Sequence, residues 1–247
     1  MKAMILAAGL GTRLRPLTDD RPKALVEVAG RTLLEITLSR LRRFGVREVI
    51  INVHHRAEMI VEYLKKNNNF GMGIEISREE ILLDTGGGLR KAAYFFLGDS
   101  SGKPLILHNV DVISTIDLGK MVQSHTESQA LATLAVQDRE ASRYLLFDQR
   151  LQLCGRRAGR DSKAEVAGSP EKVQELAFSG IHVISPRFLG MIIEEGVFSI
   201  INAYLRLAGD GEKIVGFRAD EYYWRDLGKP ENVKQAARDL EQENLLQ

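Results

Sequence analysis

The stretch that decides the fold is AMILAAGLGTRLRPLT, residues 3–18. It begins with a continuous apolar run at residues 3–8, which is typical of a strand buried on both faces of a sheet. The run passes directly into a segment rich in glycine and arginine. Gly9 and Gly11 let backbone N–H groups approach phosphate oxygens, and Arg13 adds a fixed charge with paired donors. The stretch therefore predicts a buried strand that leads into a phosphate-binding loop.

The rest of this loop separates it from two common nucleotide-binding motifs. A dinucleotide fingerprint would need a third glycine where Leu14 stands and an immediate helix, which Pro16 prevents. A P-loop would need Gly-Lys followed by Ser or Thr, which this segment lacks. Pro22 and Lys23 close the loop instead, and Lys23 adds a further positive charge. The pattern favours a phosphate loop of another kind.

Strands and helices alternate through the first half of the chain. Residues 48–53 and 104–108 are short apolar runs typical of buried strands, whereas Leu34, Leu38 and Leu41 recur at helical spacing. The β-α-β-α order, with near-continuous apolar strands, predicts an α/β fold. We expect a mostly parallel (mixed) central sheet with helices on both faces.

Further elements are predicted along the chain, with less regularity in the second half. Strands are expected near residues 131–136, 144–147, 151–154, 177–184, 214–217 and 222–224, and helices over 89–97, 186–195, 200–208 and from Pro230 onward. Residues 155–175 are polar and indicate a mobile loop or long hairpin, with a solvated loop favoured over a substrate lid. A length of 247 residues fits one domain, 1–247.

The composition excludes several classes of function. A net charge of +1 gives no basis for binding nucleic acid or an anionic membrane. The single cysteine, Cys154, permits no intrachain disulfide and indicates a reducing compartment. The N-terminal apolar run lacks a cleavable signal-peptide site, and no window reaches the roughly 18 apolar residues of a membrane span. We therefore expect a cytoplasmic protein.

Five segments together resemble a known family. Gly-x-Gly-Thr-Arg-x-x-Pro-x-Thr followed by Pro-Lys is similar to the signature of sugar-1-phosphate nucleotidyltransferases. Four further matches follow in the family's order: Asp-Thr-Gly-Gly-Gly at 84–88, Asn-Val-Asp at 109–111, Phe-Ser-Gly-Ile at 178–181 and Trp-Arg-Asp-Leu-Gly at 224–228. The resemblance implies a Rossmann-like (GT-A-like) nucleotidyltransferase fold, with residues 1–125 binding nucleotide and 126–247 binding sugar. It also implies transfer of a nucleotidyl group from an NTP to a sugar 1-phosphate, with release of pyrophosphate.

The resemblance assigns roles to individual residues. The nucleotide would be bound by Ala8, Gly9, Gly11, Thr12, Arg13, Asp84, Thr85, Gly86 and Gly87. Arg13 and Lys23 would be catalytic, because the reaction brings two anions together and needs their charge neutralised. Asp111 and Asp226 would hold Mg²⁺, which prefers one or two carboxylates plus phosphate oxygens and water. The sugar would meet Asn109, Ser179, Gly180 and Asn202.

One departure from the family leaves part of the site open. Many members carry a Glu-Lys-Pro segment whose lysine binds the sugar phosphate, and none occurs between residues 144 and 175. Lys172, Arg156, Arg157 and Arg160 are candidate substitutes. The absence is shared with smaller relatives such as N-acetylmuramate-1-phosphate uridylyltransferases, so UTP is favoured over GTP and GTP over dTTP. Heptose- and mannose-1-phosphate guanylyltransferases are also similar.

Two rival functions remain at this point. A catalytically silent subunit that binds NDP-sugar would not need the metal pair Asp111 and Asp226, and a nicotinamide-dependent reductase is disfavoured by Leu14 and Pro16. The expected partners are an NTP and a sugar 1-phosphate, without nucleic acid or membrane, and a homodimer is compatible with the resemblance.

Overall fold

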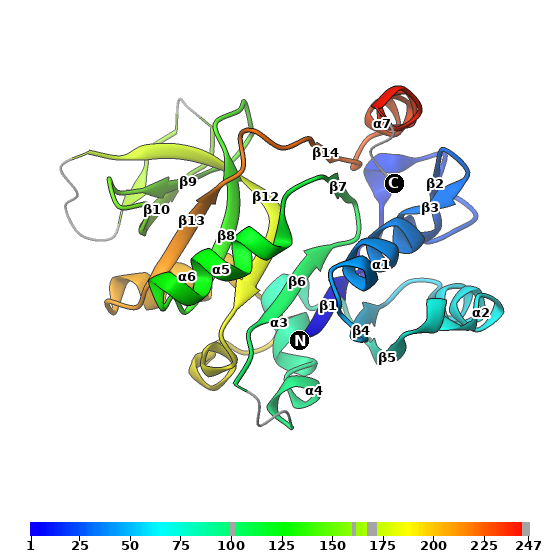
Figure 1. Cartoon of the computed structure of the whole chain (residues 1–247), viewed down its shortest axis with the longest axis horizontal. Coiled ribbons are helices and arrows are strands. Elements are labelled where there is room, and N and C mark those ends of the chain that lie inside the picture. Colours follow the sequence, from blue (N-terminus) through cyan, green and yellow to red (C-terminus); the bar gives the residue numbers. More distant parts are fainter. Residues whose placement is uncertain (99–101, 160–161, 167–171, 244–247) are drawn as a thin grey trace.

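One ten-stranded mixed sheet runs through both halves of the chain in the computed structural model, which describes residues 1–98, 102–159, 162–166 and 172–243 (Figure 1). Its strand order is β11-β10-β9-β12-β6-β1-β4-β5, with β8 and β13 attached beside β12. The strands are β1 (Lys2–Leu6), β4 (Glu48–Val53), β5 (Gly73–Arg78), β6 (Leu105–Asn109), β8 (Ala132–Gln137), β9 (Tyr144–Phe147), β10 (Leu153–Arg157), β11 (Glu165–Val166), β12 (Gln174–Ile184) and β13 (Ile214–Arg218).

Strands β1, β4, β5 and β6 are parallel, and β12 joins β6 antiparallel. The predicted mixed sheet is thus confirmed. The chain proceeds from β1 outward to β4 and β5 and then returns to the other side of β1 for β6. In open α/β sheets, ligands bind outside the carboxyl ends of the strands at such a reversal. The segments that follow β1 and β6 therefore meet at the expected edge.

Helices cover both faces of the sheet. Alternate residues of β1 explain this, because Ala3 and Ile5 belong to one buried core and Met4 to the other. The first core is covered by α1 (Leu33–Arg43), α2 (Ala57–Lys66), α5 (Leu118–Ser128) and α7 (Pro230–Glu243). The second is covered by α3 (Asp84–Lys91), α4 (Tyr94–Leu97), α6 (Ile200–Gly209) and the 3₁₀ helix η4 (Pro186–Met191). No helix of the described residues has the length and hydropathy of a membrane span.

Two short ribbons lie outside the main sheet. Strand β7 (Val112–Ser114) pairs antiparallel with β14 (Trp224–Asp226), and β2 (Glu27–Val28) pairs with β3 (Arg31–Thr32). Three 3₁₀ turns, η1 (Thr12–Leu14), η2 (Lys23–Leu25) and η3 (Asn68–Gly71), occur within connecting segments. The β7–β14 ribbon sets Asp226 opposite Val112, next to Asp111. It thereby joins the far C-terminal part of the chain to the edge at which β6 ends.

Two helix predictions need correction, and one loop prediction is decided in part. The helix expected over 89–97 begins earlier, at Asp84, and is split into α3 and α4. The helix expected over 186–195 is only the 3₁₀ helix η4. Part of the loop expected over 155–175 forms the antiparallel pair β10–β11, as a long hairpin would, while residues 160–161 and 167–171 lie outside the described part.

A partly buried arginine, Arg40, connects β6 with the end of β7. Arg40, from α1, donates to Ser114 Oγ at 2.5 Å and to the Ile116 carbonyl, and its Nη1 lies 3.5 Å from Nε2 of His108. His108 Nδ1 in turn lies 2.7 Å from the Asn109 carbonyl. Burial lowers the pKa of Arg40 to about 10, a value that keeps it charged at neutral pH. These contacts hold the two strands on either side of the turn at residues 109–111.

Three buried histidines should make the fold acid-sensitive. Burial lowers the pKa of His108 and of His182 to about 3, and that of His125 to about 4. In the unfolded chain these groups bind protons near pH 6.5. Between these values the unfolded state binds more protons, so stability falls as pH falls, by up to about 1.4 kcal/mol per unit for each histidine.

We therefore expect the free energy of unfolding to drop by about 2–4 kcal/mol from pH 7.5 to 5.5, measured by urea denaturation. Ordinary carboxylates still remain ionised in this range. His125→Gln should show a smaller drop, whereas the control His55→Gln, at an exposed position, should leave the drop unchanged. Equal stability at the two pH values would contradict this account.

Candidate functional site

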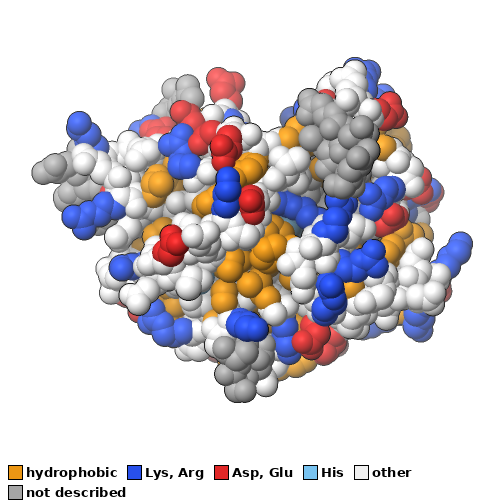
Figure 2. Space-filling model, viewed as in Figure 1, with side chains coloured by type: hydrophobic (Ala, Val, Ile, Leu, Met, Phe, Trp, Pro, Cys, Tyr) orange, Lys and Arg blue, Asp and Glu red, His pale blue; other side chains and the backbone are white. Residues whose placement is uncertain are grey.

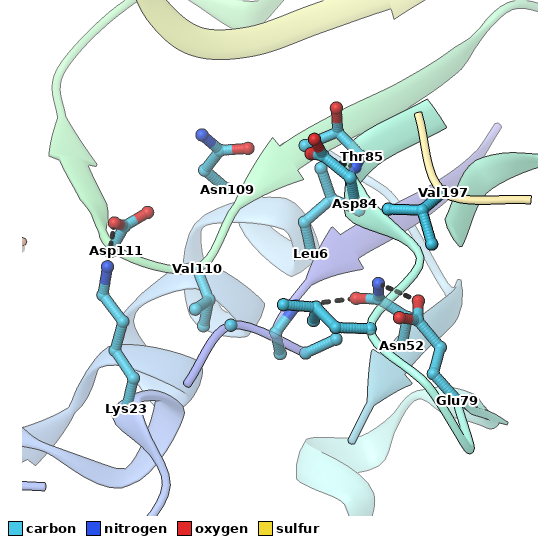
Figure 3. A pocket seen from close by; sticks show the side chains of 14 residues that line it. Leu6, Lys23, Asn52, Glu79, Asp84, Thr85, Asn109, Val110, Asp111 and Val197 are labelled. Atoms are coloured by element: carbon cyan, nitrogen blue, oxygen red, sulfur yellow. Dashed lines mark hydrogen bonds and ion pairs between the residues drawn. The ribbon is translucent and has the colours of Figure 1, made fainter. Parts of the chain in front are cut away.

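A cavity of about 340 Å³ opens at the carboxyl ends of β1 and β6 (Figure 3). It is lined by Leu6, Ala7, Ala8, Gly9, Lys23, Asn52, Glu79, Leu82, Asp84, Thr85, Asn109, Val110, Asp111 and Val197. Lys23 and Asp111 lie at one end, and Asn52, Glu79 and Asp84 at the other. The cavity thus has a charged end and a hydrogen-bonding end, which suits a molecule with a phosphate chain and a ring.

The hydrogen-bonding end is built on Asn52, which the sequence analysis did not single out. Its Oδ1 accepts from the Ala7 N–H at 2.7 Å, and its Nδ2 donates to Glu79 Oε1 at 2.7 Å. Glu79 also accepts from the Leu83 N–H at 3.0 Å. Both side chains are buried. Asn52 thus ties the end of β1 to the segment before α3. The sequence signal for Asn52 is a polar residue near the carboxyl end of an apolar strand, β4.

The charged end gathers four of the predicted residues. Lys23, at the start of η2, forms an ion pair with Asp111 Oδ2. Asp226 lies close enough to Asp111, Lys23 and Arg13 for all three charges to act on it. Burial, and then the Asp111 carboxylate, raise the pKa of Asp226, and the two cations oppose that shift. The charged form of Asp226 is therefore disfavoured, and a further cation beside it would relieve this.

Gly228 fits tightly into this end. Its N–H donates to Asp226 Oδ1 at 2.8 Å. A Cβ at Gly228 would lie 2.7 Å from Asp226 Oδ1 and 3.0 Å from Arg13 Nη2. Glycine at this position therefore lets the Arg13 guanidinium and the Asp226 carboxylate approach each other.

The predicted phosphate loop folds back on itself. Gly11 has a φ of +66°, and its carbonyl accepts from Thr18 Oγ1 at 2.9 Å. A Cβ at Gly11 would lie 3.0 Å from Thr18 Cγ2 and 3.1 Å from Lys23 Cβ. Both the conformation and the space demand glycine here. Ala8 and Gly9 line the cavity, whereas Thr12 and Arg13 are exposed at its rim.

The donor set fits Mg²⁺ better than a transition metal. The described residues contain no cluster of three or more His, Cys, Asp and Glu side chains that could hold a metal. The raised pKa of Asp226 beside Asp111 indicates a carboxylate pair that favours added positive charge. Mg²⁺ requires no more than one or two carboxylates when phosphate oxygens and water complete its shell. Asp111 and Asp226 would hold it.

The glycine run at 84–88 has a different structural role from the one expected. These residues were expected to precede a helix, but they form the first turns of α3. The N–H groups of Gly86 and Gly87 donate to the Phe198 carbonyl, at 3.0 and 3.3 Å. Those donors are used within the protein, so the predicted nucleotide contact through them is not supported by this geometry. Of the segment, Asp84 and Thr85 line the cavity.

The predicted sugar residues divide into two groups. Asn109 lines the cavity. Gly180 packs against Asn109, since a Cβ at Gly180 would lie 3.0 Å from Asn109 Nδ2. Ser179 is fully buried with its Oγ 3.4 Å from Gln137 Oε1, so its side chain faces the interior. Asn202 lies elsewhere, accepting from Arg156 Nη1 at 2.8 Å.

Asn202 lies beside a second cavity of about 520 Å³ between the β9–β10 strands and α6. Its lining residues are Arg143, Tyr144, Leu145, Arg156, Arg157, Ala158, Lys163, Glu165, Phe178, Ser199 and Ile201. The segment before α6 adjoins both cavities, because Val197 lines the first and Ser199 the second. The upper edge of the molecular face in Figure 2 is hollowed between the β9–β10 part of the sheet and α7.

Comparison with known proteins gives the family. A family model described as nucleotidyl transferase matches residues 2–243. The chain belongs to this nucleotidyl transferase family. Family membership confirms the predicted enzyme class, a sugar-1-phosphate nucleotidyltransferase of nucleotide-sugar biosynthesis.

Two curated members of the nucleotidyl transferase family match most of the chain. The N-acetylmuramate alpha-1-phosphate uridylyltransferase of Caulobacter vibrioides is 34% identical over 241 residues, which cover 93% of this chain and 92% of that protein. A probable mannose-1-phosphate guanylyltransferase of Oryza sativa subsp. japonica is 31% identical over 246 residues. The match covers 93% of this chain but only 62% of the plant protein.

Solved structures confirm the fold of this nucleotidyl transferase. HddC from Yersinia pseudotuberculosis, solved as a complex with GMP-PN, superimposes with a TM-score of 0.74 at 21% identity, covering 97% of this chain and 99% of that one. A UDP-glucose pyrophosphorylase from Acinetobacter baumanii gives a TM-score of 0.77 at 18% identity, covering 99% and 95%. At these identities the likeness concerns the fold alone.

Proposed function

We propose that this chain transfers a nucleotidyl group from an NTP, with UTP favoured and GTP second, to a sugar 1-phosphate. The observation that carries the proposal is the meeting of Arg13 and Asp226 with Lys23 and Asp111, which line one end of the first cavity. Two cations and a metal-binding carboxylate pair suit a reaction in which one phosphate must approach another.

In this proposal the NTP occupies the first cavity along its length. The base lies toward Asn52, Glu79 and Asp84, and the phosphates lie toward Lys23 and the loop at Ala8 and Gly9. The sugar lies in the second cavity, beyond Asn109 and Gly180. In this proposal residues 1–125 form the nucleotide half and residues 126–247 the sugar half, and Val197 of the sugar half reaches the first cavity.

The residues act mainly by position and charge. Lys23 leaves Asp111 when ligands enter and neutralises a phosphate oxygen instead, while Arg13 stabilises charge on the leaving pyrophosphate. Asp111 and Asp226 would hold Mg²⁺, which would supply further neutralisation of the phosphates. The attacking oxygen is that of the sugar phosphate, so the transfer is an in-line displacement at the α-phosphorus that needs no covalent intermediate on the protein.

The choice of UTP is supported by the uridylyltransferase relative, whose match extends over 92% of that protein. GTP is the second candidate because guanylyltransferase relatives are only slightly less similar and HddC was solved with GMP-PN. A cytoplasmic location and a homodimer remain predictions.

The test is release of pyrophosphate with Mg²⁺ over a grid of NTPs and sugar 1-phosphates, with Asp111→Ala as the control. Turnover with one pair, lost in the variant, supports the proposal and identifies base and sugar together. Binding of NDP-sugars in a thermal-shift assay without turnover of any pair would favour the silent-subunit alternative instead.

A further inference from the structure

Arg139 is a half-buried cation that the proposed reaction has not yet used. It lies in the connection between β8 and β9. Its guanidinium stacks on Trp224, 3.6 Å from the ring centroid, and its Nη2 donates to the Phe178 carbonyl at 2.9 Å. Its Nε is buried with no hydrogen-bond partner among the described residues. Among the described carboxylates, none is hydrogen-bonded to Arg139, and Asp226 acts on it only through space.

Its surroundings join the second cavity to the metal-binding carboxylates. Phe178, whose carbonyl it contacts, lines the second cavity. Trp224, on which it stacks, is on β14 two residues before Asp226 and donates from Nε1 to the Ser179 carbonyl at 2.7 Å. Burial lowers the pKa of Arg139, and the Asp226 carboxylate is near enough to oppose that shift. The guanidinium therefore lies between the proposed sugar and the proposed metal.

Of the candidate substitutes for the missing lysine, two are already paired with carboxylates. Arg156 pairs with Glu165, and Arg157 pairs with Glu175. Lys172 is exposed on the approach to β12, and Arg160 lies outside the described residues. The Asp226 carboxylate acts on Arg139 only through space, and the Nε of Arg139 has no hydrogen-bond partner among the described residues. A partly buried guanidinium without a bonded carboxylate is unfavourable by itself, and such a feature is expected where a ligand supplies the bonded anion.

We propose that Arg139 binds the phosphate of the sugar 1-phosphate, in the role that the missing Glu-Lys-Pro lysine has elsewhere in the family. This inference rests on the proposed function. A sugar in the second cavity must direct its phosphate toward Asp111 and Asp226, and this path passes Arg139. The stacked ring of Trp224 and the Phe178 carbonyl hold the guanidinium plane, so its free donors keep one orientation. Arg139 would also reduce the repulsion between the two reacting anions.

The test compares Arg139→Met and Arg139→Lys with the wild type under steady-state conditions, with the NTP–sugar pair identified above. Loss of a charge-assisted contact to the phosphate should raise KM for the sugar 1-phosphate by about 10- to 100-fold in Arg139→Met. KM for the NTP should change less than about threefold, because the first cavity is untouched. Arg139→Lys keeps the charge but loses the paired donors of the guanidinium, so its KM for the sugar 1-phosphate should lie between those of the wild type and Arg139→Met. The exposed Arg150 provides the matched control Arg150→Met, which should leave both constants unchanged.

Competition by inorganic phosphate gives a second readout. Its inhibition constant against the sugar 1-phosphate should rise by a similar factor in Arg139→Met. Equal changes in both KM values, together with a lower melting temperature, would show a structural role and overturn the inference. Unchanged KM for the sugar 1-phosphate in an active variant would also overturn it. Absence of turnover in the wild type with every pair would instead count against the proposed function itself.

Discussion

Asp226→Asn is expected to reduce kcat by about 10²–10³-fold while the melting temperature stays equal or rises. The loss of activity follows because one of the two carboxylates proposed to hold Mg²⁺ disappears. The gain in stability follows from the raised pKa of Asp226, which means that burial and Asp111 disfavour its charged form in the folded state. Asparagine keeps the shape and an Oδ1 acceptor for the Gly228 N–H.

The direction of the expected change in melting temperature distinguishes loss of the metal site from unfolding of the variant. A group whose pKa is raised on folding opposes folding above that pKa, so replacing it by a neutral isostere removes the opposition at pH 7. Pyrophosphate release and thermal denaturation of the same preparation check both halves. Asp210→Asn is the matched control, since Asp210 is exposed and its 3.5 Å ion pair with Arg206 contributes little. An active Asp226→Asn enzyme, or one that is inactive because it has lost its fold, would contradict the account.

Gly87→Ala is expected to destabilise the fold by about 1–3 kcal/mol, although alanine is the better helix former. Helix propensity alone would predict a gain of about 1 kcal/mol for this position within α3. A Cβ at Gly87, however, would lie 2.5 Å from the Gly196 carbonyl oxygen and 3.0 Å from Leu83 Cβ. The first contact is with backbone, which cannot rotate away as a side chain can. The steric term should therefore exceed the propensity term.

The control for this experiment is Gly190→Ala, in η4, where a Cβ meets nothing within 4 Å. Urea denaturation should show a lower midpoint for Gly87→Ala and little change for Gly190→Ala. Because Val197 lines the first cavity beside Gly196, Gly87→Ala should also raise KM for the NTP. A stabilised Gly87→Ala protein would mean that α3 does not pack against this segment as described.

The N-terminal strand and loop could be predicted from the sequence, whereas the role of the glycines at 86 and 87 could not. The apolar run at 3–8 and the segment after it are local patterns, and they correctly predicted a strand, β1, that leads into a loop. The positive φ of Gly11 was not part of that prediction. The glycines at 86 and 87 fit two explanations, ligand contact or close packing. Only the position of residues 196–200, more than 100 residues away in the chain, favours packing.

The site also depends on residues that are distant in the sequence and meet only in the folded chain. Asp111 and Asp226 could be paired in advance only through the family pattern, because the ribbon that joins them consists of two three-residue strands, β7 and β14, too short for a periodic signal. Asn52 and Glu79 belong to none of the matched motifs, and both lie against Gly88 of α3, which only the fold brings to Asn52. Arg139 has no motif around it and gains its position from Trp224.

The central claim, attack of a sugar phosphate oxygen on the α-phosphorus of an NTP, has a direct isotopic test. The sugar 1-phosphate that gives turnover is labelled with ¹⁸O in its non-bridging phosphate oxygens. The masses of the products are then measured by mass spectrometry. The account predicts that all of the label appears in the NDP-sugar and that the pyrophosphate is unlabelled. Label in pyrophosphate or in free phosphate, or release of pyrophosphate without formation of an NDP-sugar, would contradict it.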